Sequence, residues 1–340
     1  MKTTNKFLLT ATALAVLTST SAFASKGIDI IKTDDITVNL DGDLDLKIIN
    51  KGDGTTIEAN WDDFDTSFKY KIDEHLAFLA GTDWSMEEEY GSSLYNKGLY
   101  MGFAYDDHKI MAGSQEISFD KFGVDHAEIA PADKSSGYHD GNKSTWHNTA
   151  FVYTYSLENG YISATYAKGS GDDDKDQDAS EFDVYQLLAF MDVGNFELMG
   201  GIGQTKGVDG DASPDYESVY GQLEAVYNYS NGQLGINVAM EDDKDSFTSQ
   251  GVDLDFTYKL SKKATFNLGA SYITQDMDGT DENDDYTSVY AGVKYKFNNY
   301  VILYTEIGQE DGDLASYGSA TSFSSKDNDN TVGMYLNFQY

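Results

Sequence analysis

The chain contains no cysteine, no arginine and only two prolines, Pro131 and Pro214, among its 340 residues. Without cysteine, no disulfide framework can hold the fold together. Because proline cannot donate to a sheet ladder, its scarcity leaves room for long uninterrupted strands. After residue 24 the chain also lacks any run of about twenty apolar residues, the length that a membrane-spanning helix requires. These absences favour a β-rich fold and argue against a helical membrane protein.

Acidic side chains greatly outnumber basic ones. The chain has 58 Asp and Glu residues against 23 basic residues, all of them Lys, which gives a formal net charge of −35 at pH 7. This charge excludes nucleic-acid binding, since contact with phosphates needs a basic surface. Strong acidity can accompany disorder, but disordered chains have few aromatic residues. Here Tyr occurs 25 times and Phe 18 times, so we expect a folded protein.

The first 24 residues have the pattern of a secretory signal peptide. Lys2 and Lys6 precede an apolar stretch over residues 7–17, and Ala22-Phe23-Ala24 supplies a cleavage pattern of small residues around one aromatic. We predict cleavage after Ala24 and export from the cytoplasm. The remaining residues, 25–340, are expected to form one domain.

Hydrophobic residues recur with a period of two along most of the chain. In the last segment Val332, Met334, Leu336, Phe338 and Tyr340 alternate with small or polar residues. Strict alternation of this length predicts a strand with one apolar face. The same pattern predicts sixteen strands, at residues 36–49, 57–71, 76–84, 97–106, 108–115, 146–156, 160–168, 181–192, 195–204, 216–229, 233–242, 249–260, 264–274, 285–297, 300–309 and 330–340.

The connections between these strands alternate between short and long. Short links such as 106–108 and 298–299 are followed by long links rich in Asp and Gly, such as 169–180 and 308–330. An up-and-down barrel with tight turns at one rim and long loops at the other produces this alternation. We therefore predict an all-β fold: a 16-stranded antiparallel transmembrane β-barrel with short periplasmic turns and long extracellular loops. A soluble sandwich would need two cores and linkers, and no linker-like composition is present.

Three segments resemble the general porin family of Gram-negative bacteria. They are the first strand at residues 36–46, the strand–turn–strand at 61–80, and the last strand, which ends on an aromatic residue, Tyr340. The resemblance implies an outer-membrane barrel that contacts the lipid bilayer and lipopolysaccharide and assembles as a homotrimer. It further implies a diffusion channel for small hydrophilic solutes, with no enzymatic activity and no cofactor.

The third long connection, residues 115–145, differs from the other loops. In the porin family this loop folds into the lumen and narrows it. Here Phe119 and Phe122 could anchor such a loop to the inner wall. Because long loops without secondary structure are usually functional, we predict that this one is inserted.

The predicted constriction is acidic. The family sets acidic groups of the third loop against arginines of the wall, and this chain has no arginine. The loop offers Glu116, Asp120, Asp125 and Glu128; the inward wall offers Asp43, Asp45, Asp63 and Asp65, with Lys69 on the same face lower down. A ring of carboxylates attracts cations and repels anions. We therefore predict a preference for cations.

Aromatic residues indicate both a girdle and an alternative function. Those near short turns are typical of the periplasmic membrane interface: Tyr70, Tyr105, Tyr155, Tyr229, Tyr258, Phe297 and Tyr340. Four others, Tyr100, Tyr220, Tyr286 and Tyr290, are predicted to face inward. An inward aromatic track would suit a sugar- or oligosaccharide-specific channel, which remains one alternative. A non-conducting structural or adhesive barrel is the other.

Catalytic and metal-binding motifs are missing from the sequence. No Gly-x-Ser-x-Gly motif surrounds a serine, and none of the histidines has the spacing of a zinc protease: His75, His108, His126, His139 and His147. The aspartate-rich tract 171–178 lacks the glycine and distal glutamate of a calcium loop. We predict neither a catalytic nor a metal site.

Within the predicted strand 181–192, the segment 182–192 departs from simple alternation. Its Leu187-Leu188-Ala189-Phe190 stretch is apolar on both faces. A strand buried against another subunit would have this pattern.

Overall fold

A computed structural model describes residues 27–51, 54–86, 95–122, 146–170, 181–207, 217–244, 247–277, 283–314 and 323–339. The predicted signal peptide lies outside these residues. The strands are β1 (Ile28–Lys32), β2 (Ile36–Lys51), β3 (Gly54–Lys71), β4 (Leu76–Met86), β5 (Tyr95–Tyr105), β6 (His108–Glu116), β7 (Trp146–Leu157), β8 (Gly160–Ser170), β9 (Glu181–Val193), β10 (Phe196–Gly207), β11 (Glu217–Tyr229), β12 (Gly232–Asp243), β13 (Phe247–Lys259), β14 (Ala264–Met277), β15 (Asn283–Lys296), β16 (Val301–Leu314) and β17 (Phe323–Gln339). A short 3-10 turn, η1 (Ser118–Lys121), follows β6. Within the described ranges, no helix is long and apolar enough to cross a membrane.

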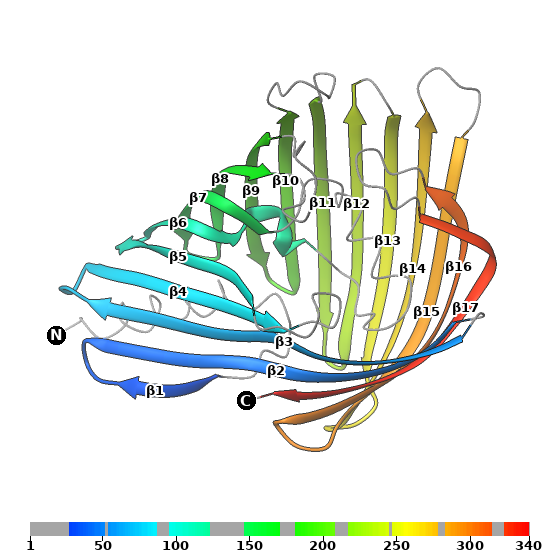
Figure 1. The fold of residues 1–340 in the computed structure, drawn as a ribbon, viewed down its shortest axis with the longest axis horizontal. Helices are drawn as coiled ribbons and strands as arrows, with labels where there is room; N and C mark the ends of the chain where they lie inside the picture. Colours follow the sequence, from blue (N-terminus) through cyan, green and yellow to red (C-terminus); the bar gives the residue numbers. More distant parts are fainter. Residues whose placement is uncertain are drawn as a thin grey trace.

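Sixteen of these strands close into a barrel. From β2 onward each strand pairs antiparallel with the next, and β17 pairs with β2 from Val332↔Asn50 to Gln339↔Asp43. Figure 1 shows the strands curving round one continuous wall. Closure lets the ladders satisfy the backbone groups of each strand, which lipid requires. The predicted 16-stranded barrel is confirmed.

The strand β1 was not predicted. It pairs with the beginning of β2, from Ile28↔Leu40 to Lys32↔Thr37. The last strand, β17, stops opposite Asp43, so β1 covers the edge of β2 that β17 leaves open. Unpaired edges tend to recruit other chains, and β1 pairs this stretch of β2. The alternation rule misses it because all five of its residues are exposed.

The burial pattern is the reverse of that of a soluble protein. On β12, Leu234, Ile236 and Met240 are exposed, whereas Asn237 and Glu241 on the opposite face are 1% and 2% exposed. On β13 and β14 the exposed Leu254 and Leu268 likewise alternate with the buried Asp253 and Asn267. A barrel whose solvent is lipid places its side chains in this way. Exposed Tyr70, Tyr105 and Phe297 lie beside short turns, as the predicted girdle requires.

The last long link is shorter than predicted. The sequence suggested a loop over residues 308–330, but β16 continues to Leu314 and β17 begins at Phe323, and these two residues pair. A register shift between Glu310 and Gly312 accompanies the extension, and Gly312 has a φ of +104°. Glycine adopts this conformation without steric cost, so a polar, Gly-containing segment still forms strand when its neighbour is already in place.

Candidate functional site

The chain enters the barrel interior directly after β6. Ile117 is 2% exposed, and η1 follows, closed by a hydrogen bond of 3.2 Å from the Phe122 N–H to the Phe119 carbonyl. Both phenylalanines are buried. A 3-10 turn of four residues is a usual length for this tight geometry. The beginning of the third long loop is therefore inserted, as predicted.

Hydrogen bonds tie η1 to the inner faces of β8 and β9. The Ser118 hydroxyl lies 2.8 Å from the Ser163 hydroxyl and 2.6 Å from that of Thr165. The Phe119 N–H donates to Oε1 of Gln186 at 3.1 Å. Buried backbone donors need such partners, because leaving one unpaired costs about 1–3 kcal/mol. These bonds fix the turn against the wall.

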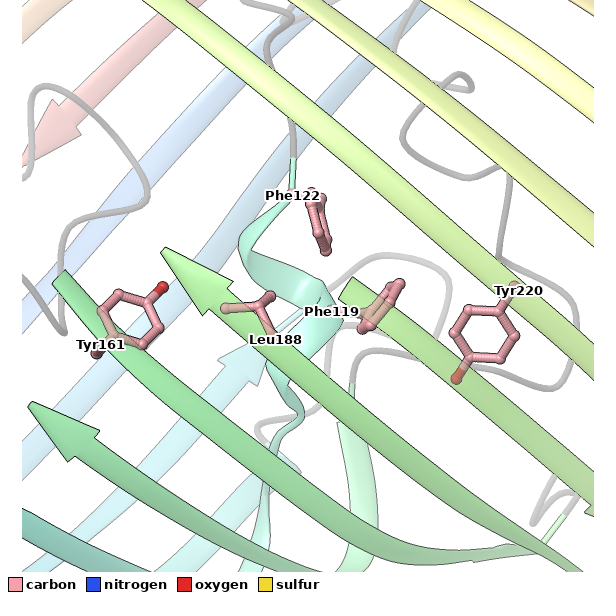
Figure 2. Close-up of a cluster of buried hydrophobic side chains, with 5 residues drawn as sticks. All are labelled: Phe119, Phe122, Tyr161, Leu188 and Tyr220. Carbon is pink, nitrogen blue, oxygen red and sulfur yellow. The ribbon is translucent and has the colours of Figure 1, made fainter. Parts of the chain in front are cut away.

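An apolar cluster completes the attachment of η1. It contains Phe119, Phe122, Tyr161, Leu188 and Tyr220, and Figure 2 shows Phe119 between Leu188 and Tyr220. The rings of Phe119 and Tyr220 meet edge to face, with centroids 5.0 Å apart at 90°, and Phe122 lies 4.9 Å from Phe119. Such geometry is favourable for aromatic pairs. Phe119 and Phe122 are confirmed as the anchors.

The cluster also explains why one of the two faces of β9, the inner face, is apolar. Leu188 is fully buried inside the barrel beside Phe119, and Phe190 packs against the same cluster. Leu187 points outward and is 49% exposed. The apolar inner face is therefore explained by the inserted loop. Only the outer face is left for the predicted subunit contact.

Inward tyrosines lie across glycines of the neighbouring strand. Gln186, Gly203 and Tyr220 form one register row over β9, β10 and β11. A Cβ at Gly203 would overlap the Tyr220 ring, so glycine is needed for the ring to pass over β10. The tyrosine hydroxyl then accepts a hydrogen bond of 3.0 Å from Nε2 of Gln186. Because Gln186 also binds Phe119, this row supports η1 from behind.

The same construction recurs on the far strands. Asp255, Gly269 and Tyr290 form a row over β13, β14 and β15, and the Tyr290 hydroxyl donates to Oδ2 of Asp255 at 2.6 Å. The Tyr286 hydroxyl donates to Oε2 of Glu310 at 2.9 Å. These tyrosines face inward as predicted, but each hydroxyl is used within the wall.

Acidic side chains line the inner face of β2, β3 and β4. Asp41, Asp65 and Asp83 share one register row, and Asp43 and Asp45 follow along β2. We call these five residues the acidic tract. Nδ2 of Asn337 on β17 donates to Oδ2 of Asp43 at 2.6 Å and to Oδ1 of Asp45 at 2.7 Å. The amide therefore joins the closing strands through the carboxylates.

One residue predicted for the loop side of the constriction, Glu116, is the last residue of β6. Glu116 is exposed at the end of β6, and Asp65, Asp83 and Glu116 all act electrostatically on the inward phenol of Tyr100. Lys69 also lies on the inward face, closer to the end of β3.

Four predicted residues are placed only in part or not at all. Asp120 belongs to η1, and Asp63 pairs in register with Asp43; their side chains lie outside the described part of the chain. Asp125 and Glu128 lie wholly outside it.

Sequence reasoning missed a second set of inward acids on β11 to β16. They are Glu224, Glu241, Asp243, Asp253, Asp255, Glu306 and Glu310. The same alternation, applied to the later strands, would have found them. Inward lysines were also missed, among them Lys47, which lies 5.1 Å from the ring centroid of Tyr335, and Lys294, which lies 4.6 Å from that of Tyr304. Among the residues that the structure describes, no group of three or more His, Asp or Glu could hold a metal ion.

The periplasmic turns carry a separate polar contact. Nδ1 of His75 lies 2.6 Å from Oδ1 of Asp106, and this carboxylate raises the pKa of His75. The Asp73 carboxylate accepts the N–H groups of His75 and Leu76, both at 2.8 Å, which lowers the pKa of Asp73. These bonds join two neighbouring turns outside the channel.

Comparison with known proteins agrees with this architecture. A model of the Gram-negative porin family matches residues 10–315. No curated protein matches the chain. OmpT, an outer membrane protein of Vibrio cholerae solved in trimer form, is 19% identical with a TM-score of 0.73, covering 90% of this chain and 100% of its own.

Two further solved structures share the fold. An anion-selective porin from Comamonas acidovorans is 12% identical with a TM-score of 0.70, covering 90% of this chain and 100% of its own. OmpF of Salmonella typhi, in complex with daunomycin, is 14% identical with a TM-score of 0.68, covering 91% and 99%. Since the family model spans most of the sequence and the barrel closes as in these proteins, the chain belongs to the Gram-negative porin family of outer-membrane channels.

Proposed function

We propose that the protein forms a water-filled pore for passive diffusion of small hydrophilic solutes and ions, and that it prefers cations. The proposal rests on one observation, the acidic tract of Asp41, Asp43, Asp45, Asp65 and Asp83 on the inner wall. Fixed carboxylates raise the local cation concentration and repel anions, especially where low-dielectric walls focus the field. The pore needs neither a cofactor nor catalytic chemistry.

The inner aromatic residues argue against a sugar-specific channel. Tyr220, Tyr286 and Tyr290 are each 2% exposed, and their hydroxyls bind wall residues. A sugar track would need exposed aromatic faces in succession. Their packing supports a wall-building role, and with it a diffusion pore.

Ion selectivity tests this proposal. We expect the purified protein in a planar bilayer with a salt gradient to give a reversal potential that favours cations. Replacing Asp43, Asp45 and Asp65 together with Asn should shift that potential toward anions, since three fixed negative charges leave the lumen. A control with the same charge change is Asp34→Asn, Asp35→Asn and Asp107→Asn, because these aspartates lie exposed at the turns.

The difference between the two variants isolates the effect of the acidic tract. An equal shift in both would mean that total charge, and not the lumen, sets selectivity. A wild-type protein that prefers anions would overturn the cation preference. Absence of any conductance would overturn the pore itself in favour of a structural or adhesive barrel.

We also propose that the barrel assembles as a homotrimer. Leu187 and Met191, on the outer face of β9, are each 49% exposed, and the related OmpT of Vibrio cholerae was solved in trimer form. Native electrophoresis of the unheated protein should give a band of three barrels. A band of one barrel alone would contradict the trimer.

A further inference from the structure

The short turns at the periplasmic rim differ in charge around the barrel. From the turn before β2 to the turn before β8, each turn carries exposed carboxylates and no lysine: Asp34, Asp35, Asp73, Glu74, Asp106, Asp107 and Glu158. The turn between β13 and β14, residues 260–263, instead carries exposed Lys262 and Lys263 and no carboxylate. In a ring of sixteen strands it lies opposite the turn between β5 and β6. We call residues 260–263 the basic turn.

Hydrogen bonds join the basic turn to the neighbouring turn between β15 and β16. The Ser261 hydroxyl accepts the N–H groups of Lys263 at 3.1 Å and Ala264 at 3.0 Å, a local bond typical of serine in turns. The Lys263 carbonyl accepts the Lys296 N–H at 2.7 Å, and Nζ of Lys263 donates to the Phe297 carbonyl at 3.1 Å. The two turns therefore form one surface at the rim. Because a carbonyl is neutral, the charge of Lys263 is not cancelled by this contact.

No carboxylate offsets the lysines at this part of the rim. Lys259 directly precedes the basic turn and Lys296 lies beside it, so they meet Lys262 and Lys263 at the two joined turns. Among the residues that the structure describes, none of these lysines takes part in an ion pair. The chain as a whole has a net charge of −35. An uncompensated positive charge therefore distinguishes this side of the rim from the acidic side.

The outer face beside the basic turn is apolar and aromatic. Leu260 and Phe297 are 56% and 48% exposed, and the rings of Phe297 and Tyr295 meet edge to face with centroids 5.0 Å apart. Farther along the strands, towards the middle of the membrane, exposed Leu268 and Val293 continue this surface. Aromatic residues of this kind lie at the boundary between lipid headgroups and hydrocarbon. We call Leu260, Tyr295 and Phe297 the apolar shelf.

We infer that the basic turn and the apolar shelf together bind an anionic phospholipid at the periplasmic rim. Lysine ammonium groups bind phosphates as point charges, and several lysines at one position strengthen the local field. The acyl chains then lie along the shelf, which a free phosphate would not use. The acidic turns on the opposite side repel the same headgroup, so the lipid is held on one side of the barrel. The site lies outside the lumen and is independent of what the pore conducts.

Native mass spectrometry of the intact protein in detergent tests this inference. The protein is titrated with phosphatidylglycerol or with zwitterionic phosphatidylethanolamine of the same acyl chains, and we expect the wild type to bind phosphatidylglycerol more tightly. Lys262→Gln and Lys263→Gln should each weaken this binding about fivefold, and the double variant about thirtyfold. The matched control is Lys32→Gln. It removes an exposed lysine from the same rim, but Lys32 already binds Asp29 at 2.6 Å, so we expect no change.

Two further measurements separate a lipid site from a site for phosphate alone. Phe297→Ala should weaken the binding of both lipids, because the shelf contacts their acyl chains, and glycerol 3-phosphate should not displace bound phosphatidylglycerol. Circular dichroism verifies that each variant folds. Displacement by an equal concentration of glycerol 3-phosphate would overturn the lipid assignment, as would equal affinity of the wild type for the two lipids. Equal losses in Lys262→Gln and Lys32→Gln would overturn the assignment to the basic turn. None of these results depends on conductance, so they are distinct from a failure of the pore proposal.

Discussion

The inner wall of this barrel has two regions of opposite character. Under η1, the wall of β8 to β11 presents hydroxyl, amide and apolar groups, such as Ser163, Gln186 and Leu188. At the closing strands β16, β17 and β2 it presents carboxylates and an amide, including Asp45 and Asn337. It also presents stacked tyrosines with lysines on their faces. In a ring of sixteen strands, β8 and β16 are eight strands apart and so lie opposite each other.

The difference shows that the covering of a wall decides its composition. Where a loop packs on the inner face, that face behaves as a small protein core and needs apolar groups and paired neutral hydrogen bonds. Where no described element packs on it, the face carries charge. The two faces of an alternating strand therefore have different surroundings, and those of the inner face change from strand to strand.

The largest effect is expected at the covered wall. Phe119→Ala removes the ring that packs on both Leu188 and Tyr220, and a loss of this kind costs about 3–5 kcal/mol in a buried cluster. We expect η1 to detach and the single-channel conductance to rise. The comparison is with Phe103→Ala, because Phe103 is an outward residue, 51% exposed, that touches no part of η1. An unchanged conductance would mean that the hydrogen bonds of Ser118 and Phe119 suffice.

The closing strands are tested by Asn337→Ala. The substitution removes the amide that donates to both Asp43 and Asp45. Loss of a hydrogen bond to a buried acceptor lowers the free energy of unfolding by about 1–3 kcal/mol. We expect a lower midpoint of guanidinium unfolding in detergent, followed by tryptophan fluorescence. Asn228→Ala provides the control, since Asn228 donates to a single carboxylate, Glu197, at 2.6 Å. An equal decrease of the unfolding midpoint in both variants would mean that the hydrogen bonds at the closing strands contribute no more than one elsewhere.

A third variant separates the wall from the loop. Gly269→Ala would place a methyl group in the Tyr290 ring and push its hydroxyl away from Asp255. Overpacking of this kind costs about 1–3 kcal/mol. We expect a lower unfolding midpoint with unchanged conductance, because this row does not touch η1. Gly221→Ala should be neutral, since the nearest atom to its new methyl group is 3.6 Å away.

Most of the barrel could be predicted because lipid imposes a simple rule. An outward apolar face and a closed ladder are required on every strand, so residues such as Leu234 and Met240 indicate their strand directly. The extension of β16 to Leu314 escaped prediction because that segment is polar on both faces. Its strand structure depends on its partner and not on its own pattern.

The site was less predictable than the barrel. Alternation placed Asp43, Asp45 and Asp65 on the inner face, and the two phenylalanines identified the inserted loop. It could not show that Lys121 lies over the ring of Tyr161, because that contact depends on where η1 packs. Nor could it show why Leu188 is apolar, since the covering segment is about seventy residues away in the chain.

The smallest effect is expected at the periplasmic turns, far from both walls. The folded protein raises the pKa of His75 above its ordinary value of about 6.5. The contact with Asp106 therefore stabilises the fold fully below that ordinary value, and the contribution disappears as pH rises through the raised pKa. Both side chains are about half exposed, so the contribution is small. We expect Asp106→Asn to lower the unfolding midpoint at pH 5.5 and to leave it unchanged near pH 9. Asn suits this position because Asp106 has a φ of 47°, which Asn adopts readily. A difference that grows with rising pH would contradict the assigned pairing of His75.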